Sequence, residues 1–282
     1  MQTQVTEEQI AFYQENGYIV IPDVLTPDEL QTWRAVVDEA VAERGEKTFA
    51  DATGLNAKRP EIPDGHDEDT EFYNSVFTQR VNLWQTNEKM RHLMWDEQLG
   101  KMIADLARVD GIRIWHDQAL IKQPYANYTA FHLDVPYWSF TSPDAISIWF
   151  ALDDAKLENG CLYYVPGSHK AQKYDNCGIT QNLGALFEVY PEWKDIAPVA
   201  CPVPAGGVCI HNGLTAHGAG ANMTPGLRRA MTCAYMPDGS TFNGQPNVLP
   251  PSYMQTLKVG DVLEDDRHNP LIFSRSKKAV TV

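Results

Sequence analysis

The pattern of apolar residues changes near residue 111, and this change limits the folds open to the chain. Before it, apolar residues recur at helical spacing in the segments 7–16, 27–44 and 87–107, with one short strand at 18–21. After it come short segments rich in β-branched and aromatic residues, at 112–123, 145–152, 162–165, 207–211 and 228–236. Helices followed by many strands predict a mainly β chain with flanking α-helices, built as a jelly roll or barrel whose core starts at about residue 111.

Capping signals mark the ends of the first two helices. Thr6 with Gln9 forms a capping box, and Gly17 ends that helix. Thr26 opens the second helix, with proline at its first helical position, and Gly45 ends it.

The length and composition are those of one large domain. The chain has 282 residues, of which 43% are hydrophobic, so it can bury a sizeable core. It shows no internal repeat and no low-complexity linker, and we expect a single domain over 1–282. Residues 51–70 are polar and rich in glycine, proline and acidic residues. They predict a long loop that is either a lid or disordered.

Charge and cysteine content restrict the partners and the compartment. The formal net charge is −14 and no block of lysine and arginine stands out, which argues against a nucleic acid partner. No apolar run has the roughly 18 residues that a membrane span needs, and the N-terminus lacks the regions of a signal peptide. The five cysteines, an odd number without a CxxC pair, indicate reduced thiols in a cytoplasmic protein. These features do not predict an oligomeric state.

The segment Phe131-His132-Leu133-Asp134 places an imidazole and a carboxylate two residues apart. In a strand, or at its exit, residues i and i+2 point the same way, so His132 and Asp134 could reach one metal ion. A second histidine would complete a 2-His-1-carboxylate triad, which leaves open positions on ferrous iron.

His217 is the best candidate for the third ligand. It follows an apolar strand and precedes a glycine-rich stretch, whereas His211 more resembles a strand residue that points elsewhere. Arg228, eleven positions after His217, could form a bidentate pair with a carboxylate. Neighbours on a strand face opposite sides, so only one of Arg228 and Arg229 can point inward, and the spacing favours Arg228.

Several motifs in order resemble the phytanoyl-CoA dioxygenase family of Fe(II)- and 2-oxoglutarate-dependent oxygenases, over roughly residues 8–240. The matching pieces are His132-x-Asp134, Trp149 within 148–154, Glu158-Asn159-Gly160-Cys161-Leu162, Pro166-Gly167-Ser168-His169-Lys170, His217-Gly218-x-Gly220-x-Asn222 and Arg228-Arg229-Ala230. The resemblance implies a double-stranded β-helix, a cupin-like jelly roll. It also implies Fe(II) on His132, Asp134 and His217, with no catalytic residue beyond the metal site.

The same resemblance implies that 2-oxoglutarate, the cosubstrate, pairs with Arg228. Further residues expected at the cosubstrate site are Gln118, Trp149, Ser168 and Arg80. Trp149 is equally compatible with core packing. We interpret His116 as a structural residue, or as one that contacts the ligand-binding residues without binding a ligand itself. We interpret His169 as a structural hydrogen-bonding residue.

The implied reaction is the oxidation of an unactivated C–H bond of a small organic molecule, using O2 and releasing succinate and CO2. The expected outcome is hydroxylation, desaturation, cyclisation or epoxidation, whereas Asp134 argues against halogenation. Candidate substrate residues are Tyr125, Asn127, Tyr137 and Trp138. Aromatic walls with few charges favour a neutral or cationic metabolite over a CoA thioester. The alternatives are a non-catalytic jelly-roll protein that binds a metal or ligand, an acyl-CoA hydroxylase, and a hydrolase on a cupin-like barrel.

Overall fold

The computed structural model describes residues 1–46, 67–175 and 177–276. One group of strands comprises β1 Tyr18–Ile21, β2 Thr78–Val81, β3 Gly111–Lys122, β5 Ile146–Ala151, β8 Val208–Asn212, β10 Arg228–Pro237 and β11 Leu271–Ser274. They form an antiparallel sheet in the order β1-β8-β5-β10-β3-β11, with β2 also paired to β3. A second group comprises β4 Thr129–His132, β6 Leu162–Tyr164, β7 Val199–Cys201 and β9 His217–Ala219. It forms a smaller antiparallel sheet in the order β4-β9-β6-β7.

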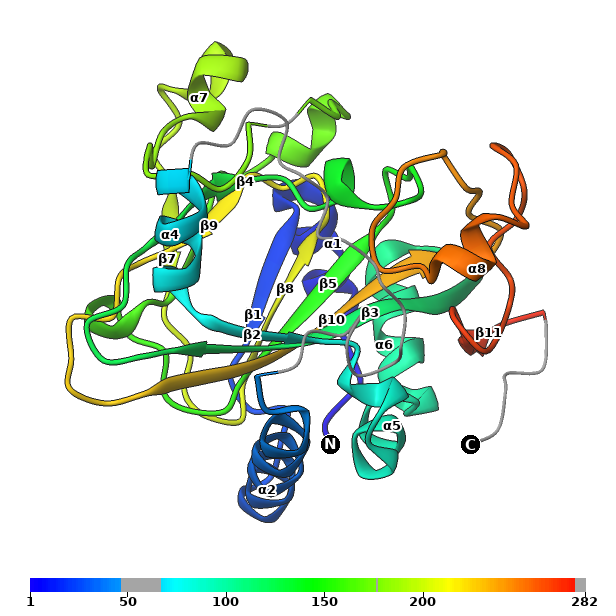
Figure 1. The fold of residues 1–282 in the computed structure, drawn as a ribbon, viewed down its shortest axis with the longest axis horizontal. Coiled ribbons are helices and arrows are strands. Elements are labelled where there is room, and N and C mark those ends of the chain that lie inside the picture. The colour runs from blue at the N-terminus through cyan, green and yellow to red at the C-terminus, as the bar shows by residue number, and fades with distance from the viewer. Residues whose placement is uncertain (47–66, 176, 277–282) are drawn as a thin grey trace.

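Helices flank the sheets, as the sequence predicted. They are α1 Glu7–Asn16, α2 Pro27–Arg44, α4 Asp67–Val76, α5 Glu88–Met94, α6 Glu97–Ala107, α7 Leu186–Val189 and α8 Pro251–Met254. Apolar residues of α1, α2, α5 and α6 share one core with one face of the larger sheet, and Figure 1 shows α1 behind the strands and α2 and α5 below them. No helix in the described part of the chain has the length and apolar composition needed to cross a bilayer.

The capping signals identified the helix ends correctly. The Thr6 side chain accepts the Gln9 amide at the start of α1, and Gly17 ends the helix with a left-handed φ of 79°. Thr26 caps α2 in the same way. The helical prediction for 87–107 was too simple, because Asp96 accepts the Leu99 amide and starts a second helix there.

The larger sheet is covered on both faces. In β5, Ile146, Ile148 and Phe150 belong to the core beneath the helices. The alternate residues Ser147 and Trp149 line the cavity on the other face, between the two sheets. Such a strand has apolar residues at most positions, so the sequence predicts a strand here. Because the pattern does not alternate, it does not show which residues face the cavity.

The predicted strand segments all contain a strand of the structure. The short strands β2, β7, β9 and β11 were missed, because three or four residues are too few to show an alternating pattern. The sequence predicted a lid or disorder for 51–70. Of these residues, 51–66 lie outside the described part of the chain, and from Asp67 the chain is helical.

Candidate metal centre

Three donor side chains meet between the two sheets. His132 ends β4 and lies opposite His217, the first residue of β9. Asp134 follows at the start of a short 3₁₀ turn. One ligand atom from each side chain lies within 4.8 Å of the others. Asp134 Oδ1 is 3.7 Å from His132 Nε2 and 3.8 Å from His217 Nε2, so one cation between them would reach all three.

Both imidazoles are oriented by their own backbone. His132 Nδ1 lies 2.9 Å from the Ala130 carbonyl oxygen, and His217 Nδ1 lies 2.9 Å from the Thr215 carbonyl oxygen. A carbonyl can only accept, so Nδ1 carries the proton and the lone pair of Nε2 faces the Asp134 carboxylate. This is the tautomer that binds a metal through Nε2.

The protonation states suit a cation. Burial lowers the pKa of both His132 and His217, which favours neutral imidazoles. Burial opposes ionisation of Asp134 as well, but His217 and the hydrogen bond from His211 hold the pKa of its carboxyl well below the ordinary value. Two neutral nitrogens and one carboxylate remain near neutral pH.

His211 points to this site, and our interpretation of it as a strand residue pointing elsewhere was wrong. Its Nε2 lies 3.1 Å from Asp134 Oδ2, and the Ser147 hydroxyl donates to the same oxygen at 3.0 Å. The hydroxyl of Tyr164 lies 3.0 Å from His211 Nδ1. These contacts fix the carboxylate so that Oδ1 is left to face the two histidines.

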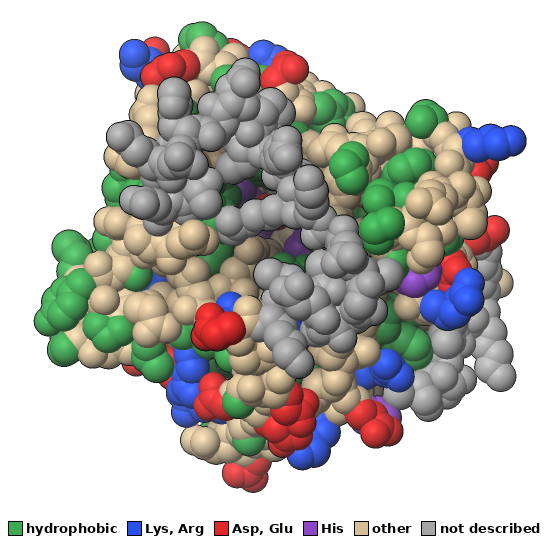
Figure 2. All heavy atoms as spheres, viewed as in Figure 1, with side chains coloured by type: hydrophobic (Ala, Val, Ile, Leu, Met, Phe, Trp, Pro, Cys, Tyr) green, Lys and Arg blue, Asp and Glu red, His purple; other side chains and the backbone are tan. Residues whose placement is uncertain are grey.

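The donors open into a cavity of about 560 Å³. Figure 2 shows histidine side chains at the bottom of an opening in this face of the molecule. Besides the histidines, the cavity is lined mainly by apolar, aromatic and uncharged polar side chains, and Asp134 and Arg228 are the only aspartate, glutamate, lysine or arginine residues in the described lining.

Arg228 lies in this cavity and is only 2% exposed. Its Nε and Nη1 atoms have no hydrogen-bond partner among the described residues, and its guanidinium carbon lies 5.0 Å from the centre of the Trp149 ring. Burial lowers the pKa of Arg228 to about 10, which leaves it charged at neutral pH. A buried charged donor without a partner is costly, so the site is suited to an anion such as a carboxylate.

Arg229 lies on the opposite face of β10. Its guanidinium forms two hydrogen bonds with Asp153, at 2.9 and 2.8 Å, and one with Asp38 at 2.7 Å. It does not line the cavity.

Gln118 and Trp149 also line the cavity. Both are aligned with Thr232 of β10, which lies between them across the larger sheet. The side chain of Gln79, from β2, donates to Gln118 Oε1 at 2.5 Å and also lines the cavity. Gln79 was not identified from the sequence.

The structure contradicts the expectation for Arg80. Gln79 and Val81 line the cavity, so alternation along β2 turns Arg80 to the other face. There its Nε donates to the Gly45 carbonyl at 2.6 Å, and Nη2 lies 3.7 Å from Glu46. The expectation that Arg80 lines the cosubstrate site was therefore wrong, because its side chain faces away from the cavity.

Ser168 does not line the cavity either. Its hydroxyl donates to the Val165 carbonyl at 2.8 Å and accepts the Ala216 amide at 2.8 Å. It therefore ties its turn to the residue that precedes His217, which is a structural role.

The substrate candidates divide into two groups. Tyr137 and Trp138 line the cavity. Tyr125 is 72% exposed with a φ of 59°, and the Asn127 side chain donates to the Ser75 hydroxyl at 2.9 Å, away from the cavity. These two lie on a turn after β3, whose direction the sequence did not reveal.

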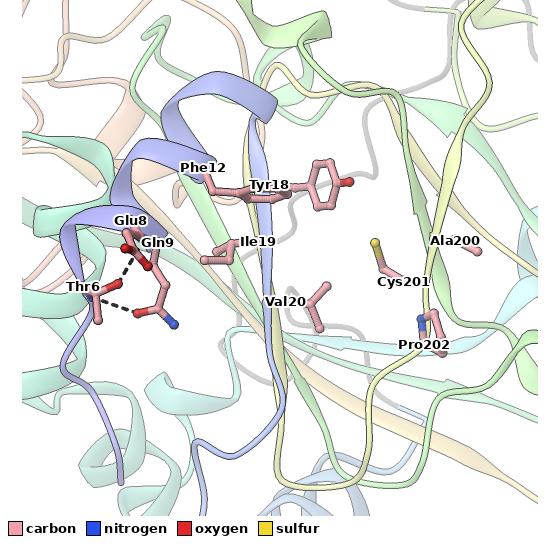
Figure 3. Close-up of a pocket in the computed structure, with 10 residues that line it drawn as sticks. All are labelled: Thr6, Glu8, Gln9, Phe12, Tyr18, Ile19, Val20, Ala200, Cys201 and Pro202. Carbon is pink, nitrogen blue, oxygen red and sulfur yellow. Dashed lines mark hydrogen bonds between the residues drawn. The ribbon is translucent and has the colours of Figure 1, made fainter.

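A second hollow, of about 500 Å³, lies between edge strands β1 and β7 (Figure 3). Tyr18, Val20 and Cys201 lie around it, and Glu8 is the only charged residue among the described residues that line it. Without histidines or paired carboxylates it offers no metal centre.

The sequence profile of the phytanoyl-CoA dioxygenase (PhyH) family matches residues 13–230. The chain belongs to this family. The match includes the three donor residues and Arg228. Because the family consists of Fe(II)- and 2-oxoglutarate-dependent oxygenases, the enzyme class and the cofactors expected from the sequence are confirmed.

Individual relatives agree with this assignment. "Dioxygenase lolE1" of Epichloe uncinata is 29% identical over 259 residues, covering 90% of each chain. The solved structure of SnoK, a non-heme alpha ketoglutarate dependent carbocyclase from nogalamycin biosynthesis, is 26% identical with a TM-score of 0.75, covering 95% of this chain and 96% of that one. The structure of the epimerase SnoN in complex with Fe3+, alpha ketoglutarate and nogalamycin RO is 23% identical with a TM-score of 0.70, covering 94% of this chain and 98% of that one. These likenesses confirm the double-stranded β-helix.

Proposed function

We propose that this chain is an oxygenase that uses Fe(II), 2-oxoglutarate and O2 to oxidise an unactivated C–H bond of a small organic metabolite, releasing succinate and CO2. Fe(II) is bound by His132, Asp134 and His217, and Arg228 binds the distal carboxylate of 2-oxoglutarate. The observation that carries the proposal is the presence of both features in one cavity: a cluster of three metal donors and a buried guanidinium with unpaired donors.

Fe(II) chelated by a 2-oxo acid activates O2 for oxidation of a C–H bond. The protein positions the groups for this reaction. The three donors line the cavity, so a metal held by them would be accessible to molecules in it. Trp149 packs against the Arg228 guanidinium, and Gln118 and Thr232 line the same cavity.

The described cavity lining disfavours the alternatives. A binding protein without catalysis has no need of a buried arginine whose Nε and Nη1 lack partners among the described residues, in the same cavity as the metal donors. An acyl-CoA carries several phosphate charges, and Arg228 is the only lysine or arginine among the described lining residues. A hydrolytic metal site adds a general base, and the described lining has no free carboxylate beyond Asp134.

The proposed reaction ends in one of four outcomes: hydroxylation, desaturation, cyclisation or epoxidation. The names of SnoK and SnoN describe a carbocyclase and an epimerase, which supports outcomes other than hydroxylation on this fold. The expected partners are a small-molecule substrate and O2, and the cytoplasmic location stays a prediction from the cysteines.

Succinate formation tests the proposal. The purified protein, Fe(II), ascorbate and 2-oxoglutarate are incubated with a metabolite panel, and succinate and new product masses are measured together. We expect succinate that depends on both Fe(II) and 2-oxoglutarate and rises with one metabolite class. If succinate formation is independent of added Fe(II), or is the same in Asp134→Ala, the proposal is wrong.

A further inference from the structure

One row of inward-facing residues crosses the larger sheet beside the metal donors. The strand register aligns His211 with Ser147, Ser147 with Ala234, and Ala234 with His116. The first two residues bind the Asp134 carboxylate. The row therefore leads from the metal donors, across the small side chain of Ala234, to a second histidine.

His116 has hydrogen-bonding capacity that the described protein does not use. It lines the cavity and is 7% exposed, and its Nδ1 has no hydrogen-bond partner among the described residues. Burial lowers its pKa to about 4, so the ring is neutral near pH 7. A neutral imidazole can donate through one nitrogen and accept through the other, and leaving a buried polar group unpaired is unfavourable.

The surroundings of His116 are aromatic and apolar. Trp138 packs edge-on against its ring, with the ring centres 6.0 Å apart. Val248 and Ala234 add apolar surface in the same cavity. Asn247 Oδ1 is another buried polar atom in this lining without a hydrogen-bond partner among the described residues.

The spacing leaves room for a ring between His116 and the metal donors. Strands in a sheet lie about 4.8 Å apart, and β10 separates the strands that carry His116 and Ser147. The backbones at these two residues are therefore about 10 Å apart. The residue between them, Ala234, has a small side chain and lines the cavity. Six-membered rings have the thickness and width to fit in such a gap.

We propose that His116 is a substrate-binding residue that selects uncharged, ring-containing substrates carrying a hydroxyl or carbonyl group. The polar group bonds to His116, the ring packs against Trp138, and the C–H bond to be oxidised lies over Ala234 toward the metal donors. The inference rests on the proposed function, in which Asp134 and Arg228, the two charged residues of the described lining, are already engaged by iron and 2-oxoglutarate.

Binding of matched probes tests this proposal without turnover. The protein is loaded with Fe(II) and 2-oxoglutarate without oxygen, and the binding of 2-naphthol, 2-methylnaphthalene and 2-naphthoate is measured by calorimetry. The first two probes have nearly the same shape and differ in the hydroxyl. We expect 2-naphthol to bind about tenfold more tightly than 2-methylnaphthalene, a difference of about 1.4 kcal/mol, and 2-naphthoate to bind more weakly than 2-naphthol.

Variants assign the preference to one residue. His116→Leu should reduce the preference for 2-naphthol to less than about twofold, and His116→Gln, which keeps a polar side chain, should restore part of it. His268→Leu is the matched control, because His268 lies outside the cavity and stacks on Tyr253.

The proposal is overturned if neither naphthalene probe binds, if the hydroxyl gives no advantage, or if His116→Leu keeps the full preference. The visible charge-transfer absorption of the Fe(II)–2-oxo acid chelate, recorded on the same samples, separates the two hypotheses. Loss of the 2-naphthol preference with the chelate intact concerns His116 alone, whereas a wild-type protein that forms no chelate contradicts the proposed function.

Discussion

The guanidinium of Arg228 is the side chain on which cosubstrate binding most depends. It is buried with open donors, while its neighbour Arg229 is already paired with Asp153 and Asp38. A bound carboxylate would give Arg228 the charge-assisted hydrogen bonds that the described protein does not supply. The Arg229 guanidinium already has these hydrogen bonds, to Asp153 and Asp38.

Arg228→Ala should raise the KM for 2-oxoglutarate by about 30-fold or more, because truncating one partner of a buried charged pair costs about 2–5 kcal/mol. Succinate formation at varied 2-oxoglutarate concentrations measures it. Arg229→Ala is the matched control and should change the KM by less than about twofold, since exposed or half-exposed ion pairs contribute little. If the two effects were reversed, the carboxylate would be bound by the other arginine.

His211 is a positioning residue, because it acts on the metal donors through Asp134 Oδ2. His211→Phe should weaken Fe(II) binding about 10- to 100-fold, the usual effect of losing a hydrogen bond behind a metal ligand. His211→Gln should recover part of the affinity, and the KM for 2-oxoglutarate at saturating Fe(II) should change little. Unchanged iron affinity in His211→Phe would contradict this role.

The sequence contained a signal for His211 that we did not use. Val208 and Ile210 of β8 face the helices, so Cys209 and His211 must face the other side, where His211 lines the cavity. For Arg80 the same argument was not possible, because β2 is four residues long and its start could not be placed. The inward face of a residue can be predicted only where its strand has a clear alternation.

At the scale of elements, the close pairing of β4 and β9 brings His132 and His217 together. Gly218 permits this approach, because a Cβ added there would lie 2.7 Å from the Thr129 carbonyl oxygen on β4. Backbone atoms cannot avoid such a contact without a shift of one strand. The absence of a side chain at Gly218 therefore sets the separation of the two histidines.

Gly218→Ala should lower the iron affinity about tenfold or more and destabilise the fold by about 1–3 kcal/mol, as overpacking usually does. Iron titration and denaturant unfolding measure the two effects. Gly226→Ala is the control, since a Cβ there would meet only the Thr224 hydroxyl at 3.9 Å. Equal iron affinity in both variants would show that β4 and β9 tolerate separation.

Most elements were predictable because they carry local signals: caps for α1 and α2, and apolar segments for β3, β5, β8 and β10. The break between α5 and α6 and the short strands β2, β7, β9 and β11 carry weak signals and depend on tertiary pairing. The candidate metal donors were found through the order of several motifs along the chain. The pairing of β4 with β9, which brings His132 opposite His217, could not be predicted from the sequence.

For the whole molecule, the buried Lys122 makes the free energy of unfolding depend on pH. It is fully buried and aligned with Arg228 across the β3–β10 pair. Its amine donates to the carbonyls of Val76 and Asn127, at 3.2 and 2.5 Å, which a neutral amine with two hydrogens can satisfy. Burial, with a further contribution from Arg228, lowers the pKa of Lys122 to about 6.

This pKa predicts how stability changes with pH. Between the folded pKa of about 6 and the ordinary lysine value of 10.5, the unfolded chain binds a proton that the folded protein does not. The free energy of unfolding should therefore rise with pH in this range, by up to about 1.4 kcal/mol per pH unit. Denaturant unfolding at pH 7 and pH 9 should show this rise for the wild type relative to Lys122→Met. A constant difference between the two proteins would mean that Lys122 is charged in the folded state.

His132, Asp134 and His217 are proposed to hold one Fe(II) together with 2-oxoglutarate. Anaerobic titration of the wild-type protein with Fe(II), followed by the visible absorption of its 2-oxoglutarate chelate, tests whether they do. We predict one Fe(II) per chain, a chelate band that requires 2-oxoglutarate, and the loss of both in Asp134→Ala. A wild-type protein that binds no iron, or an Asp134→Ala variant that gives the same stoichiometry and the same band, would contradict the account.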